Sequence, residues 1–371
     1  MKKNVIVICI DGCRVDRAEG SSIFKNKTEG NIFFNKSITY APYTNASMHA
    51  VFSGVNGNRN GCYSYWHTFK FDNTHFKTLT EYLKEDGYFT YANVHSKLCI
   101  PKKGFDMFEI YDENDVNYID YHKSILQDMK KKNENGEEFF LYLHYSGIHT
   151  GIRDQVLKKY DNFSADYFLD NEKNNERYDY LFSNAEKYLD ELKNKIDELN
   201  LDKISVIMII SDHGCSVGER NGERAYGAFC YDYTIKTFVS LIIPEFKKKI
   251  ITKQVRHIDF LPTILEFLNI PLDKTYNHVD GESLIPLIKE DKFVEKMAYS
   301  ETANPLNEKA PPKKPNTKSV RTSKWKLIFN EYNNTRELYN LEDDPDEKKN
   351  LSRTNLDIEN TLWLELQKLQ L

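Results

Sequence analysis

The sequence predicts an α/β fold in which a mostly parallel sheet is flanked by helices and followed by a small antiparallel α+β subdomain. Two observations support this fold class. Apolar, β-branched runs alternate with helical patterns over residues 1–303. Beyond residue 303 the chain becomes proline-rich and then continues in short strand-like pieces. We therefore expect one large domain over residues 1–303, with a linker and a small subdomain over residues 304–371.

The expected central strands are continuous apolar runs, without alternation of polar and apolar residues. Such runs are typical of strands that are covered by helices on both faces of a parallel sheet. The expected strands are Val5–Ile10, Phe139–Leu143, Ser205–Ile210 and Phe238–Ile243.

Helical patterns separate these strands. They are expected at Thr78–Lys84, Asn174–Leu199 and Asp259–Leu268. In the longest of them an apolar residue recurs every three or four positions, which is typical of a helix that packs one face on a core. These positions are Leu181, Ala185, Tyr188, Leu192 and Ile196.

The C-terminal part of the chain differs in composition from the first 303 residues. Four prolines and several lysines fall within Asn304–Thr317, which is typical of a linker. The expected strands that follow are Ser319–Arg321, Lys326–Phe329 and Glu337–Tyr339, and a last helix is expected at Leu356–Leu371.

Composition excludes several kinds of partner. The chain has 371 residues, is 40% hydrophobic and has a formal net charge of -5, so it is globular and offers no positive field for a nucleic acid. It contains no apolar run of about 18 residues, so no integral membrane segment is expected. Its six cysteines form no CxxC pair. We therefore expect a reduced, cytoplasmic chain.

Acidic residues and a histidine follow two of the expected strands. Asp11 comes directly after the first strand, and Asp212 and His213 follow Ser205–Ile210. Ligands of open α/β sheets bind beyond the carboxyl ends of the strands. Two carboxylates and an imidazole at this edge predict a divalent-metal site. The alternative is that each Asp only caps the next helix.

A hydroxyl lies at the expected start of a short helix. The segment Ala46–Ser53 is expected to be helical after a turn that contains Pro42, which places Thr44 at the helix N-terminus. Backbone N–H groups at such a terminus favour anions. The Thr44 hydroxyl could then attack a phosphorus or sulfur centre if a metal lowers its pKa. The alternative is that Thr44 only caps the helix.

Several motifs occur in an order that resembles the sulfatase branch of the alkaline-phosphatase superfamily. The likeness covers nearly the whole chain and implies an alkaline-phosphatase-like fold. The motifs are the strand ending in Asp11, Ala41–Gly54, Leu143–Thr150, Ser211–Gly214 with Gly218 and Glu219, Arg256–Ile264, Asp280–Leu284 and Glu337–Leu341 with Asp344 and Pro345.

The resemblance also implies roles for single residues. The implied metal ligands are Asp11, Thr44, Asp212 and His213, and the implied nucleophile is Thr44. His149 matches a histidine near the leaving group and is the expected general acid, with a structural role as the alternative. Substrate contacts are implied for Ser47, His95, Lys97 and Tyr226, although His95 and Lys97 could also belong to a solvated loop. His144 is expected to be structural.

The nucleophile segment departs from the sulfatase pattern, because it has Thr44 in place of Cys or Ser and Met48 in place of Arg. Thr cannot be converted to formylglycine, and relatives with Thr are typically phosphodiesterases, phosphatases or phosphoethanolamine and phosphoglycerol transferases. We therefore expect a metal-dependent phosphoester hydrolase or phosphoryl-group transferase that forms a covalent ester on Thr44. The alternatives are a sulfuric ester hydrolase and a non-catalytic anion-binding member of the family.

The expected cofactor is one divalent metal ion. Two carboxylates, one imidazole and a hydroxyl suit Mn²⁺ or Zn²⁺ better than Ca²⁺ or Mg²⁺, which prefer oxygen ligands throughout. The expected substrate is a small-molecule or glycan-linked anionic ester.

Overall fold

The structure is a computed structural model that describes residues 2–25, 30–114, 117–157, 165–223, 225–303 and 317–370. Its main element is a nine-stranded sheet. The order along the sheet is β4 (Met107–Ile110), β3 (Phe89–Val94), β5 (Phe139–Tyr145), β1 (Asn4–Ile10), β6 (Ser205–Ile210), β7 (Lys236–Ile242), β2 (Asn31–Ile38) and β8 (Lys249–Ile251), while β9 (Val255–Arg256) also pairs with β2.

Most of this sheet is parallel, as the sequence predicts. The strands β4, β3, β5, β1 and β6 are parallel neighbours, and β7 is antiparallel to both β6 and β2. The central strand β1 is buried along its whole length, which explains why its sequence is continuously apolar. The fold class inferred from the sequence is therefore confirmed.

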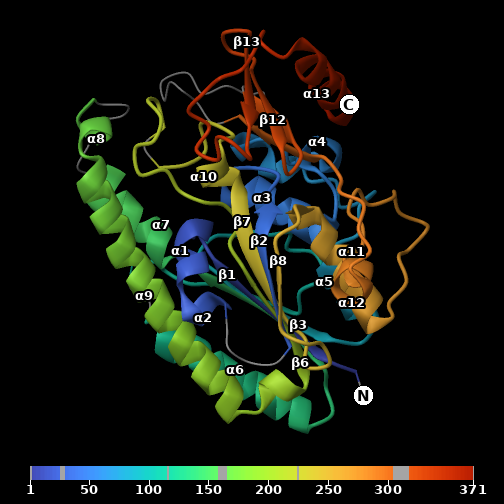
Figure 1. Ribbon diagram of the computed structural model, residues 1–371. Coiled ribbons are helices and arrows are strands. Elements are labelled where there is room, and N and C mark those ends of the chain that lie inside the picture. The colour runs from blue at the N-terminus through green and yellow to red at the C-terminus, as the bar shows by residue number, and fades with distance from the viewer. Residues whose placement is uncertain are drawn as a thin grey trace.

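Helices cover both faces of the sheet (Figure 1). Ile6, Ile8 and Ile10 of β1 point into one apolar core, and Val5 and Val7 point into the other. The first core is closed by α1 (Val15–Gly20), α2 (Ser22–Lys25), α6 (Tyr118–Glu134), α7 (Gly147–Ile152), α8 (Ala165–Leu169) and α9 (Asn171–Glu198). The second is closed by α3 (Thr44–Ser53), α5 (Leu79–Glu85), α11 (Phe260–Leu268) and α12 (Ile285–Glu290).

Shorter helical elements connect these layers. They are α4 (Gly57–Asn60), α10 (Asp232–Ile235), the 3₁₀ turns η1 (Tyr65–Lys70), η3 (Leu201–Lys203) and η4 (His257–Asp259), and the π turn η2 (Arg153–Leu157).

A separate four-stranded antiparallel sheet forms the C-terminal part, drawn in orange and red in Figure 1. Its strands are β10 (Ala298–Thr302), β11 (Thr317–Arg321), β12 (Trp325–Asn330) and β13 (Thr335–Asn340), and α13 (Leu356–Leu369) packs against it. The predicted linker lies outside the described residues, apart from Thr317. The strand β10 comes before residue 303, so the small sheet takes one strand from the segment that precedes the expected linker.

The small sheet also touches the helix that carries Thr44. Val320, Leu327 and Leu338 share an apolar cluster with Ala46 and Ala50 of α3. The C-terminal part therefore packs against the helix that begins at Thr44.

Candidate active site

The candidate site forms at the carboxyl edge of the parallel sheet. The strand β1 lies between β5 and β6, in a register that pairs Cys9 with His144 on one side and with Ile210 on the other. Asp11 follows β1 directly, and Asp212 follows β6 after one residue. Since the three strands are parallel and adjacent, these polar side chains meet at one edge.

Thr44 approaches the same point from α3. It is the first residue of this helix, which begins two residues earlier than the sequence predicted. Its hydroxyl Oγ1 donates to Asp11 Oδ2 over 3.3 Å and is almost fully buried. The helix N-terminus and Asp11 thus face each other, so that an anion bound at the helix would lie beside the carboxylates.

The cluster of Asp11, Asp212 and His213 fits a divalent cation. One ligand atom from each residue lies within 4.8 Å of the other two, and all three side chains are fully buried. Asp11 Oδ1, Asp212 Oδ2 and His213 Nε2 have no hydrogen-bond partner among the described residues. Buried polar atoms without partners are costly, and a cation would satisfy all three at once. The residues predicted as ligands are therefore the ones that are brought together.

The pKa values of Asp11, Asp212 and His213 also indicate that this cluster favours a positive charge. Burial raises the pKa of Asp11, but His149, His144 and His213 outweigh burial and hold it well below its usual value. Burial and the neighbouring Asp11 raise the pKa of Asp212. Burial lowers the pKa of His213, but the two carboxylates more than compensate and raise it to about 9. The cluster thus favours a positive charge at its centre, carried by a proton or a metal ion.

His149 and Tyr226 border this cluster and contact each other. The Tyr226 hydroxyl lies 2.6 Å from His149 Nδ1, and that nitrogen is 4.0 Å from Asp11 Oδ1. His149 is in the short helix α7, and its side chain is 26% exposed, whereas the metal-ligand candidates are closed off. An imidazole that is partly accessible and next to a buried charged site is well placed to exchange a proton with a substrate.

The other predicted substrate contacts are placed differently. Ser47 is fully buried, and its hydroxyl lies 2.6 Å from Thr39 Oγ1 and donates to the Asp212 carbonyl over 2.7 Å. It therefore ties α3 to the metal-ligand segment. His95 lies against the rings of His144 and His149, with centroid distances of 4.7 and 5.8 Å.

Lys97 is exposed on the turn after β3, and the structure does not bring it into contact with this group. Its predicted contact with the substrate stays a prediction.

Two residues at this edge of the sheet were not predicted from the sequence to belong to the site. His144 was expected to be structural, yet its Nε2 lies 3.2 Å from Asp11 Oδ2. Cys99 lies beside His95, with Sγ 3.6 Å from the ring nitrogens. The only signal for Cys99 was its position four residues after His95 in the turn that follows a strand.

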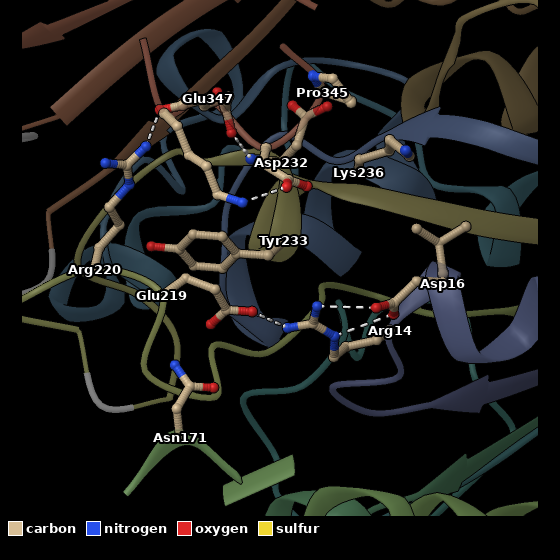
Figure 2. A pocket seen from close by; sticks show the side chains of 13 residues that line it. Arg14, Asp16, Asn171, Glu219, Arg220, Asp232, Tyr233, Lys236, Pro345 and Glu347 are labelled. Atoms are coloured by element: carbon tan, nitrogen blue, oxygen red, sulfur yellow. Dashed lines mark hydrogen bonds and ion pairs between the residues drawn. The ribbon is translucent and has the colours of Figure 1, made fainter. Parts of the chain in front are cut away.

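A cavity of about 450 Å³ lies close to this site but does not contain its residues (Figure 2). Arg14 is on its wall between Asp16 and Glu219, pairing with both carboxylates, and it also donates to the Cys215 carbonyl. Arg220 and Glu347 line the opposite side. Because these charges largely pair with each other, we assign the chemistry to the Asp11 cluster and not to this cavity.

Among the described residues, no helix combines the length and the apolarity that a bilayer-spanning segment needs. The cytoplasmic location stays a prediction.

Comparison with protein families identifies the class to which this site belongs. A family model described as Sulfatase matches residues 3–270, and one described as N-sulphoglucosamine sulphohydrolase, C-terminal, matches residues 226–371. The chain therefore belongs to the sulfatase family, within the alkaline-phosphatase superfamily, and is a sulfatase-like hydrolase. A search of curated protein sequences gave no match.

Solved structures share the fold at low sequence identity. A protein solved with its substrate D-glucosamine-2-N,6-O-disulfate is 15% identical, with a TM-score of 0.73 and coverage of 100% of this chain and 98% of that chain. A 2-O GAG sulfatase is 18% identical, with a TM-score of 0.70 and coverage of 98% and 91%. A phosphonate monoester hydrolase of Agrobacterium radiobacter is 12% identical, with a TM-score of 0.71 and coverage of 100% and 95%.

These findings correct the predicted function. The prediction of a phosphoester hydrolase or phosphoryl-group transferase is wrong, because both family models describe sulfatases and the similar structures include several sulfatases. The prediction gave too much weight to Thr44. A buried cation site facing a helix N-terminus binds a tetrahedral anion without distinguishing sulfur from phosphorus. The sulfatase alternative agrees better with the comparisons.

Proposed function

We propose that this protein hydrolyses a sulfate ester of a sugar or glycan in a reaction that depends on a divalent metal ion. The observation that carries the proposal is the convergence of the Thr44 hydroxyl with three buried ligand atoms that have no hydrogen-bond partner among the described residues, in a chain of the sulfatase family. The substrate class rests on the solved relatives, one of which has the substrate D-glucosamine-2-N,6-O-disulfate.

Asp11, Asp212 and His213 would hold the cation, with Thr44 as a further ligand. Mn²⁺ or Zn²⁺ suits this mixed set of oxygen and nitrogen atoms best. When bound, the cation would polarise the sulfate oxygens and favour the ionised Thr44 hydroxyl.

Thr44 is the proposed nucleophile. A threonine side chain cannot become the formylglycine aldehyde, so the hydroxyl itself must react. Thr44 Oγ1 attacks the sulfur atom, gives its proton to Asp212, whose pKa is raised and to which Thr44 hydrogen-bonds, and displaces the sugar oxygen by breaking its bond to sulfur. The product of this step is a sulfate ester of Thr44.

His149 is the proposed general acid. The departing sugar oxygen must gain a proton, and His149 is the partly exposed imidazole next to the buried cluster. Water then attacks the sulfur of the Thr44 ester, which releases inorganic sulfate and restores the hydroxyl. Asp212 returns its proton to the Thr44 oxygen, and His149 regains its proton as this water is deprotonated, so the cycle is balanced.

A paired assay tests the class of ester. The protein is stripped with a chelator, reloaded with Mn²⁺ or Zn²⁺, and given 4-nitrophenyl sulfate, 4-nitrophenyl phosphate and D-glucosamine-2-N,6-O-disulfate. Released sulfate and phosphate are measured by ion chromatography. We expect metal-dependent sulfate release with a higher kcat/KM than phosphate release. Turnover of the phosphate ester alone would contradict the proposal, and so would a metal-loaded protein that is inert on all three.

A further inference from the structure

A second group of metal-ligand residues lies next to the proposed cation site. It consists of His95, Cys99 and His144, and one ligand atom from each lies within 4.8 Å of the other two. Cys99 and His144 are buried, and His95 is half-buried. None of the roles assigned above uses the Cys99 thiol.

The fold itself brings these three residues together. His95 follows β3 directly, and His144 is near the end of β5, which pairs with β3 in parallel. After His95 a tight turn brings Cys99 back toward it, because the Cys99 and Leu98 N–H groups both donate to Ser96. The thiol is thus held by backbone hydrogen bonds beside two imidazoles.

The distances suit a tetrahedral ion. Zn–S and Zn–N bonds of about 2.3 and 2.0 Å place neighbouring ligand atoms roughly 3.5 Å apart. Cys99 Sγ lies 3.6 Å from both ring nitrogens of His95, so the thiol is near that separation from an imidazole nitrogen, and rotation of the ring would point one nitrogen at a shared ion. Within the described part of the chain, Cys99 is the hydrogen-bond partner found for these nitrogens, and a thiol is a weak one.

His144 has the support that a metal-binding histidine requires. Its Nδ1 lies 2.9 Å from the Tyr142 hydroxyl, and its Nε2 lies 3.2 Å from Asp11 Oδ2. A tyrosine hydroxyl can accept as well as donate. Nδ1 can therefore carry the proton and leave the Nε2 lone pair for a metal, an arrangement that outer partners of metal-bound imidazoles typically enforce.

We propose that His95, Cys99 and His144 bind a thiophilic divalent ion such as Zn²⁺, at a site separate from that of Asp11, Asp212 and His213. One thiolate and two imidazoles form a softer set than two carboxylates and one imidazole, so the two sites differ in the metals they prefer. Three protein ligands leave the fourth position open to water or an anion.

The two sites are neighbours. His144 Nε2 lies 3.2 Å from Asp11 Oδ2, so an ion held by His144 would lie beside Asp11. His95 would then be occupied by the ion and lost as a contact for the substrate.

Cobalt absorption tests the proposal, because a thiolate bound to Co²⁺ gives a near-ultraviolet charge-transfer band that carboxylates and imidazoles do not give. The full chain is stripped of metal, titrated with Co²⁺ and followed by absorption. We expect a thiolate band in the wild-type protein and in Cys62→Ser, a matched control that removes another buried thiol, and no band in Cys99→Ser. An unchanged band in Cys99→Ser, or no band in the wild type, would overturn the proposal.

Two further variants separate this site from the proposed catalytic one. Asp212→Asn should keep the thiolate band, because Asp212 does not belong to the softer set. His95→Gln changes a half-buried side chain, so it is well suited to retain the fold if Cys99→Ser does not. It should weaken Co²⁺ affinity, measured by competition with a chelator, by roughly tenfold or more. Unchanged affinity in His95→Gln, or loss of the band in Asp212→Asn, would show that the thiolate site does not exist as described.

Discussion

At the scale of single residues, the contact between His149 and Tyr226 orients the proposed general acid. His149 is a partly exposed imidazole of the site, and the hydrogen bond between its Nδ1 and the Tyr226 hydroxyl, 2.6 Å long, fixes the orientation of the ring. A tyrosine at this position brings a hydrogen bond without a positive charge. The positive charge that stabilises the bound sulfate group must then come from the cation site and from the N-terminus of α3.

Tyr226→Phe should therefore lower kcat by roughly tenfold, because one hydrogen bond that orients the acid is lost. The loss should be larger for a sugar sulfate than for 4-nitrophenyl sulfate, whose leaving group needs no proton. Steady-state kinetics on both substrates provide the measurement. Tyr180→Phe, which changes an exposed tyrosine of α9, is the control. Equal losses on both substrates would rule out a role for Tyr226 through His149.

Some residues of the site could be predicted from sequence because they follow directly from the strands. Asp11, Asp212 and His213 come at the ends of continuous apolar runs, and parallel pairing brings them together. His144 and Cys99 could not be assigned in this way. Their proximity depends on the neighbour order of β3, β5 and β1, which periodicity does not reveal.

At the scale of elements, the helix α3 is the part that positions the proposed nucleophile, Thr44. It begins at Thr44 and ends at Ser53, and it is capped by Gly54, whose φ of +65° is in the left-handed region. The Gly54 carbonyl accepts hydrogen bonds from the Asp280 and Gly281 N–H groups. This ending joins α3 to the segment that follows α11.

Gly54→Ala should destabilise the protein by about 1–2 kcal/mol, because a side chain is strained at positive φ. Its Cβ would also lie 3.4 Å from Leu261. Gly20→Ala is the matched control, since Gly20 ends α1 and an added Cβ there meets nothing within 4 Å. Urea unfolding of both variants measures the difference. Equal stabilities would contradict the assigned role of Gly54.

Elements were predicted well where a single pattern decides them. The four expected strands are all present, and Asn174–Leu199 corresponds to α9 within a few residues. The start of α3 was placed two residues too late, because the pattern alone does not show that Tyr43 is the last extended residue. Hydrogen bonding at the helix end decides such boundaries.

At the scale of the whole molecule, a buried ion network joins the large sheet to the C-terminal one. Lys326 of β12 is fully buried and pairs with Asp232 at 2.8 Å and with Glu347 at 2.7 Å. Arg321 of β11 binds both oxygens of Asp232, at 3.0 and 2.9 Å. Asp232 begins α10, just before β7. The network therefore fixes the small sheet against the part of the chain that leads back into the large sheet.

Lys326→Met should destabilise the protein by about 3–5 kcal/mol, since it leaves Glu347 buried without its cation. Lys324→Met is the control. Lys324 lies two positions before Lys326 and forms an exposed ion pair with Glu342. Loss of this pair should change the free energy of unfolding little. Thermal and urea unfolding of both variants supply the measurement. If Lys326→Met were as stable as Lys324→Met, the network would not join the two parts as described.

The small antiparallel sheet was expected from the proline-rich segment that precedes it and from its short strands. The ion network that attaches it to the large sheet was not expected. Lys326 and Asp232 are far apart in sequence, and each reads as an ordinary surface residue by itself. The choice of phosphate over sulfate failed for a related reason. It rested on one side chain, whereas the family is defined by features spread over residues 3–270 and 226–371.

The rate of sulfate release from D-glucosamine-2-N,6-O-disulfate by the metal-loaded wild type and by Thr44→Ala tests the proposed function most sharply. We expect sulfate release that stops when the metal is chelated, and a loss of at least roughly a thousandfold in Thr44→Ala with the fold retained by circular dichroism. Sulfate release that persists in Thr44→Ala at a comparable rate would contradict the proposed function, because the hydroxyl beside Asp11 would then not be the group that attacks sulfur.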